Sequence, residues 1–268
     1  MRPLDIRIEA ALIAYDDDSR WDLIGGILTE CADDVLEEAT DLLHGATERG
    51  RTLGADILGR LVGVEPNCRL EVLEALLAAL AVERIAAPLA SIVAALGHIG
   101  DPGTLRRMFS LADHENAEVR LAVAFALATV SPQPIAPETR TALIRLSRDS
   151  DPEVRDWATF GLGTLSDADG PDVRAALLDR AEDDHHEARA EALFGLAVRR
   201  DPRAVPHLIR ALQSPLVGGL EVDAAAAAAD PRLLPALWAL RQAGIADEVR
   251  LRRAIDRCSG QARSTLVS

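Results

Sequence analysis

Histidines and acids gather in one short segment, and these are the residue types with which this chain could bind a metal. Asp183, Asp184, His185 and His186 are consecutive, and His207 follows in the next apolar segment. Imidazoles and carboxylates are competent metal ligands, but their spacing here matches no recognised ligand pattern. A solvated turn with a helix cap explains the same residues, so we expect neither a metal nor another cofactor.

Other chemical signatures are missing from the sequence. It contains no GxGxxG, P-loop, GxSxG or HExxH motif, which removes the simplest indications of nucleotide binding, nucleophilic catalysis and zinc hydrolysis. Cys31, Cys68 and Cys258 are far apart and form no CxxC pair, so they predict reduced thiols rather than disulfides or a thiolate zinc site. We therefore predict a protein that is not an enzyme and has no catalytic residues.

Composition indicates what kind of fold positions any functional residue. The chain has 268 residues, of which 49% are hydrophobic and only 3% aromatic. Ala and Leu must fill most of the core, and both favour helices, whereas the β-branched and aromatic residues that favour strands are comparatively scarce. The predicted fold class is all-α.

The charge is acidic and unevenly distributed. The net charge is −14, and residues 1–48 alone hold 13 Asp or Glu against 3 Arg. This sign attracts basic proteins and repels phosphate backbones, although a solubilising surface is the simpler interpretation. All 29 basic residues are Arg, which indicates a GC-rich bacterial genome. We expect no nucleic-acid partner, and we interpret the arginines of the segment 250–257 as part of a polar capping helix.

One phrase recurs along the chain. It occupies the segments 113–127, 149–165 and 183–196. A Leu near its end aligns at Leu96, Leu127, Leu162 and Leu196, with Ala225 as a weaker fifth member. The steps between them are 31, 35, 34 and 29 residues, a period typical of stacked structural repeats.

Between phrases lies a second apolar segment with helical periodicity, so each repeat is predicted to be a helical hairpin. Asp-Pro pairs at 101, 151, 201 and 230 predict helix starts. Gly97 and Gly163 are expected to let neighbouring helices approach closely. Arg155 and Arg189, seven residues before the aligned Leu, are expected to bond carbonyls or carboxylates of an adjacent repeat. Because one hairpin cannot bury its apolar face alone, about seven to eight hairpins should stack into a solenoid.

The solenoid is expected to form one domain over residues 1–258. Within it, 1–48 are acidic degenerate repeats, 49–213 the best-formed repeats and 214–258 a degenerate C-terminal cap, and 259–268 are expected to be a flexible tail. Neither a signal segment nor an apolar stretch of about 18 residues is present, so we expect no membrane association and a cytoplasmic location.

The repeated phrase, in which Val-Arg is followed by small residues and then Leu-Gly, resembles the HEAT-like repeats of the phycobilisome-lyase type, most clearly over 84–213. The resemblance implies that second helices line a concave face where partners usually bind. Such repeats serve scaffolds, adaptors and a few enzymes, so it specifies function poorly.

His186-Glu187 resembles the His-Glu pairs by which deoxyhypusine hydroxylase, another HEAT-like protein, holds two irons. That site needs several such pairs, and the other repeats offer none in this register. An enzyme or accessory factor that binds a small apolar ligand, similar to a bilin lyase or to this metal hydroxylase, is the alternative to a binding protein.

Three phenylalanines occupy one position of the repeat, five residues after the Arg. At about 100° per residue, Val154, Ala158, Leu162 and Leu165 should face the first helix, and the Phe position should face away from it. A phase error of about 40° would instead bury the rings in the seam between second helices. Self-association through these rings is a third interpretation.

We predict a partner-binding surface rather than a catalytic site. Its residues are Leu121, Phe125, Asp156, Trp157, Phe160, Glu191, Phe194 and Val198. An aromatic stripe rimmed by carboxylates suits a polypeptide with apolar anchors and Arg or Lys flanks. The predicted function is a non-catalytic scaffold, adaptor or inhibitor whose partner is another polypeptide, with basic character favoured by the acids.

Overall fold

The structure is a computed structural model that describes residues 2–14 and 16–260. Over this part of the chain it contains sixteen α-helices and a few short 3-10 turns, and the α-helices pair in sequence as eight hairpins. The prediction of an all-α solenoid of stacked helical hairpins is confirmed. None of the described helices is both long and apolar enough to cross a membrane. Most of the predicted tail, residues 261–268, lies outside the described residues, and its first residue, Ser259, belongs to α16.

The contacts divide the chain into two compact units, Met1–Pro132 and Gln133–Ser268. The first unit contains α1 (Pro3–Ile13), α2 (Asp17–Ile27), α3 (Ala32–Leu43), α4 (Glu48–Val64), α5 (Arg69–Val82), α6 (Ala86–Ile99), α7 (Leu105–Met108) and α8 (Ala117–Val130). The second contains α9 (Pro137–Leu146), α10 (Pro152–Gly163), α11 (Pro171–Arg180), α12 (His186–Val198), α13 (Ala204–Leu212), α14 (Gly219–Ala228), α15 (Leu234–Ala243) and α16 (Glu248–Ser259).

Three of the four Asp-Pro pairs start helical turns as predicted, because the Asp side chain accepts hydrogen bonds from backbone N–H groups that the first turn leaves unpaired. The prediction is wrong at Asp201, where a turn follows and α13 begins only at Ala204. Asp151 accepts from Glu153 at 3.0 Å and from Val154 at 3.2 Å, and α10 begins at the following Pro. At Asp101 and Asp230 the first turn is a 3-10 helix.

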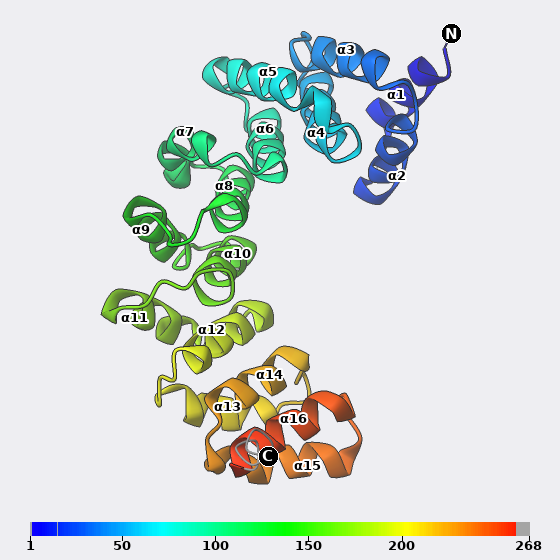
Figure 1. Cartoon of the computed structure of the whole chain (residues 1–268). Coiled ribbons are helices and arrows are strands. Elements are labelled where there is room, and N and C mark those ends of the chain that lie inside the picture. Colours follow the sequence, from blue (N-terminus) through cyan, green and yellow to red (C-terminus); the bar gives the residue numbers. More distant parts are fainter. Residues whose placement is uncertain (1, 15, 261–268) are drawn as a thin grey trace. The chain divides into compact units, whose positions relative to one another are not determined.

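The second helix of each hairpin packs directly against the second helix of the next hairpin within its unit (Figure 1). Glycine permits this approach, as the sequence predicts. A Cβ at Gly163 would lie 2.7 Å from the carbonyl oxygen of Glu191, and a Cβ at Gly97 would lie 3.2 Å from the Cα of Ala126. The first distance is shorter than real Cβ contacts, so Gly163 requires glycine, whereas a Cβ at Gly97 would be tight against Ala126 and would also displace the Phe125 ring, 2.8 Å away.

The core direction was predicted correctly for most of α10. Val154, Ala158 and Leu162 are completely buried, whereas Leu165 is 37% exposed. The prediction for Leu165 is wrong because α10 ends at Gly163, beyond which helical periodicity no longer applies.

The alignment of Ala225 is also wrong, by one helical turn. The four aligned leucines each follow the N-cap of their helix by 11 residues, whereas Ala225 follows the N-cap Gly218 by 7. The four leucines and Ala225 are all buried. The N-caps of these helices step by 31, 35, 34 and 33 residues, so the repeat spacing is kept, and the position equivalent to the aligned Leu is Ala229, just beyond the end of α14.

Candidate protein-binding surface

The predicted surface residues lie on second helices in both units. Leu121 and Phe125 belong to α8 in the first unit. In the second unit, α10 carries Asp156, Trp157 and Phe160, and the neighbouring α12 carries Glu191, Phe194 and Val198. The structure thus brings six of the eight residues onto one pair of packed helices.

The aromatic rings are half-buried. The ring of Phe125 packs against His98 with 4.8 Å between ring centroids, and it covers Gly97 of the preceding second helix. Trp157 and Phe160 meet edge to face with centroids 5.7 Å apart, the geometry that aromatic pairs favour. The Phe125 ring therefore packs between two second helices, and all three rings keep an exposed side. This arrangement lies between full burial and full exposure, the two outcomes that the sequence left open.

Asp156 has the most unusual environment on this surface. Its Oδ1 atom is buried and has no hydrogen-bond partner among the described residues. Burial raises the pKa of this carboxyl from 3.8 to about 6, and the negative charge of Glu153 adds to the effect while His185 opposes it. A carboxylate that is desolvated and unsatisfied is costly to the folded state.

Glu191 is a second carboxylate of this kind on the neighbouring helix. Burial raises its pKa, the negative charge of Asp156 raises it further, and a hydrogen bond from the Thr164 hydroxyl opposes both. The two acids are thus close enough to repel one another beside the half-buried rings. A cation placed between them would relieve both the repulsion and the missing hydrogen bond.

The segment with histidines and acids forms turns and caps. The carboxylate of Asp183 accepts two hydrogen bonds from Arg155, both 2.8 Å long, and one from Arg180. Burial alone would raise the pKa of Asp183, but these bonds outweigh it and lower the pKa to about 2. His186 lies 2.9 Å from Glu221. Within residues 2–14 and 16–260, no group of three or more His, Cys, Asp or Glu side chains could hold a metal ion.

The bonding predicted for the repeated Arg is confirmed at Arg155, which binds Asp183 of the next repeat. It is wrong at Arg189, which donates instead to the Asp183 carbonyl in the turn before its own helix. The sequence alone did not identify Asp183 as a partner of Arg155. The recurrence of an acid in the turns before second helices, as at Glu83 and Asp149, is the signal that could have found it.

A protein-family model described as HEAT repeats matches residues 73–163, 108–197 and 139–229. Together the matches span more than half of the chain. The chain belongs to the HEAT repeat family. Such solenoids typically act as protein-binding scaffolds. No curated protein matches the chain significantly in sequence.

Several solved structures resemble this HEAT repeat chain. YibA of Escherichia coli is 23% identical and superposes with a TM-score of 0.76, covering 97% of this chain and 93% of its own. An engineered protein is 17% identical with a TM-score of 0.59, covering 96% and 77%. A HEAT-like repeats protein of Thermococcus onnurineus NA1 is 15% identical with a TM-score of 0.45, covering 97% and 98%. The first two similarities show the fold alone.

Proposed function

We propose that this HEAT repeat protein is a non-catalytic scaffold, adaptor or inhibitor whose second helices α10 and α12 bind a basic segment of another polypeptide. The observation that carries the proposal is the Asp156 carboxylate, which is partly buried, lacks a hydrogen-bond partner for Oδ1 and has a pKa raised to about 6. Folding gains nothing from such a group, whereas an incoming Arg or Lys would pair with it.

The neighbouring groups support a basic side chain as the ligand. Glu191 supplies a second carboxylate close to Asp156. Trp157 and Phe160 supply aromatic surface on the same helix, which suits the aliphatic stem of Arg or Lys and the cation itself. Val198, which is 44% exposed, extends the apolar surface along α12.

The same surface favours a polypeptide over a small substrate. Its side chains are partly exposed and spread over two packed helices. An extended contact matches this arrangement better than an enclosed cavity with converging polar groups does. The second helices of stacked hairpins present such contacts in a regular series, which suits a helix or an extended segment.

Selection of displayed peptides on the full chain tests the proposal. We expect enriched peptides to combine Arg or Lys with apolar anchors. The affinity of one enriched peptide is then measured by fluorescence anisotropy for the wild type, Asp156→Asn and Glu191→Gln. Each substitution should weaken binding about tenfold, which corresponds to about 1.4 kcal/mol.

Glu138→Gln is the matched control, because Glu138 is an exposed acid on the first helix α9 of the same unit. Its affinity should stay within twofold of the wild type. Equal losses of affinity in Glu138→Gln and Asp156→Asn would show that only the overall charge matters. Enrichment of peptides without basic residues would contradict the proposed class of partner.

A further inference from the structure

The repeated Arg of the second helices makes the same two-sided contact in two repeats. In α4, Nη1 of Arg51 donates to the carbonyls of Gly45 and Ala46, while Nε and Nη2 donate to Glu83 at 2.6 and 3.5 Å. In α10, Nη1 of Arg155 donates to the carbonyls of Asp149 and Ser150. Its Nε and Nη2 atoms donate to the carboxylate of the next turn, both at 2.8 Å. One edge of the guanidinium thus donates to carbonyls of the turn that precedes its own helix, and the other edge binds a carboxylate.

That carboxylate has a fixed place in the repeat. Glu83 stands two residues before Ile85, the N-cap of α6, and accepts the N–H of that N-cap at 2.8 Å. Asp183 stands two residues before His185, the N-cap of α12, and accepts its N–H at 2.9 Å. The acid therefore accepts the N–H of the N-cap of the next second helix and also pairs with the Arg of the preceding second helix.

Arg189 of α12 keeps the first half of this contact and lacks the second. Its Nη1 atom donates to the carbonyl of Asp183, as the other two arginines do to their own turns. Two residues before Gly218, the N-cap of α14, stands Leu216, which is 64% exposed. The N–H of Gly218 is bonded instead by Glu221 from within α14, at 3.0 Å. Over the described residues, no acid forms an ion pair with Arg189.

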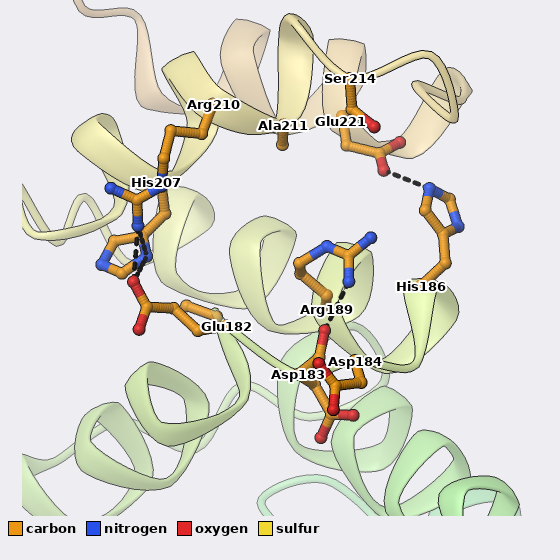
Figure 2. Close-up of a pocket in the computed structure, with 11 residues that line it drawn as sticks. Glu182, Asp183, Asp184, His186, Arg189, His207, Arg210, Ala211, Ser214 and Glu221 are labelled. Carbon is orange, nitrogen blue, oxygen red and sulfur yellow. Dashed lines mark hydrogen bonds and ion pairs between the residues drawn. The ribbon is translucent and has the colours of Figure 1, made fainter.

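A cavity of about 380 Å³ opens beside Arg189 (Figure 2). It lies entirely within the second unit, between the start of α12 and the helices α13 and α14. Figure 2 shows the guanidinium of Arg189 between the pair of His186 and Glu221 on one side and Glu182 with its partners on the other. The volume is sufficient for a small acid or for one acidic side chain.

Three of the four acids that line this cavity already have partners. Glu182 pairs with Arg210 at 2.6 Å, and Glu221 accepts the N–H of Gly218 and lies 2.9 Å from Nε2 of His186. Asp183 is bonded by Arg155 and by the backbone of the turn. The remaining lining acid, Asp184, is exposed, so solvent screens its charge. Among the described residues, Arg189 is thus the arginine of this cavity that forms no ion pair.

We propose that the cavity beside Arg189 binds a carboxylate, which takes the place that Glu83 and Asp183 fill beside Arg51 and Arg155. The planar edge formed by Nε and Nη2 suits bidentate binding of a carboxylate group. This site is separate from the surface around Asp156 and binds the opposite charge, so it does not depend on the proposed function.

Titration of the full chain with acetate tests the site, with chloride at equal ionic strength as the reference anion. The readout is the NMR signal of the Arg189 Nε–H group, and isothermal titration calorimetry supplies the affinity. We expect a saturable shift with acetate only. Arg189→Gln should lose at least tenfold in affinity, whereas Arg148→Gln, which changes an exposed arginine outside the cavity, should bind as the wild type does.

Leu216→Asp is a second variant that retains Arg189. It returns an acid to the position that Asp183 occupies one repeat earlier, and it should weaken acetate binding at least tenfold. Gln213→Asp adds the same charge to the same turn at another position and should leave the affinity within about threefold of the wild type. If Arg189→Gln does not fold, Leu216→Asp decides the result.

A blocked peptide with one Glu side chain identifies the source of the carboxylate. An affinity at least tenfold above that of acetate would assign the site to an acidic side chain of a polypeptide, and similar affinities would assign it to a small free acid. Either assignment also requires that Arg189→Gln or Leu216→Asp weakens binding at least tenfold. No acetate binding, or binding that survives Leu216→Asp, overturns the proposal.

Discussion

Replacing Asp156 with Asn should stabilise the protein at neutral pH and weaken its binding to a basic partner. The substitution keeps the size of the side chain and removes its charge. Asp156 is partly buried, and its Oδ1 atom has no hydrogen-bond partner in the described structure. At neutral pH the folded protein must hold this carboxylate in its charged form, which burial disfavours.

The raised pKa sets the size and the pH range of the effect. A change from 3.8 to about 6 corresponds to at most about 3 kcal/mol, since one pKa unit is about 1.4 kcal/mol. Because the side chain is partly exposed, solvent screening reduces this to about 1 kcal/mol. The folded state binds the proton more tightly than the unfolded state does. The resulting contribution to stability is therefore fully present below pH 3.8 and is lost as the pH rises through about 6.

Thermal denaturation at two pH values measures this effect. At pH 7.5, Asp156→Asn should raise the Tm by about 2 to 4 °C. At pH 4, where the native carboxyl is already protonated, the variant and the wild type should melt nearly together. Glu138→Gln should change neither value. A lower Tm for Asp156→Asn at pH 7.5, or an equal difference at both pH values, would refute the argument that desolvation of this charge costs stability.

Three further substitutions test the packing. Arg155→Ala leaves Asp183 buried without its main partner and should cost about 3 kcal/mol in chemical denaturation, whereas Arg148→Ala, which breaks an exposed pair, should cost less than about 1 kcal/mol. Gly163→Ala should lower stability by about 2 kcal/mol, because its Cβ meets the backbone of α12, and an unchanged Tm would show that the helices can move apart. Phe160→Ala should cost about 1 to 2 kcal/mol, less than the 3 to 5 kcal/mol of a fully buried Phe, and should weaken peptide binding more than it weakens folding.

Much of the fold could be predicted because each repeat carries its own local signals. Three of the four Asp-Pro pairs mark helical starts, and the aligned leucines are buried as expected, since helical periodicity determines which side faces the core. The periodicity failed at Leu165, which follows the end of α10. The alignment also failed at Ala225, because α14 ends at Ala228 and places no Leu at the equivalent position, Ala229.

The site was less predictable for a different reason. Whether Phe160 is buried or exposed depends on the distance between second helices, which in turn depends on small residues such as Gly163 and Gly195 in neighbouring repeats. The missing acid beside Arg189 was not recognised, because it becomes visible only when repeats are aligned on their N-caps. An absent partner leaves no motif in the sequence.

The free-energy coupling between Asp156 and a basic residue of a bound peptide tests the central claim most directly. Four affinities are needed, from wild type and Asp156→Asn, each with the selected peptide and with its key Arg or Lys replaced by Gln. If the carboxylate of Asp156 binds that residue, the effects should be non-additive by at least about 1 kcal/mol, or about fivefold in affinity. Additivity within about 0.3 kcal/mol for every basic residue of the peptide would contradict the account, because the unpaired carboxylate of α10 would then have no part in recognition.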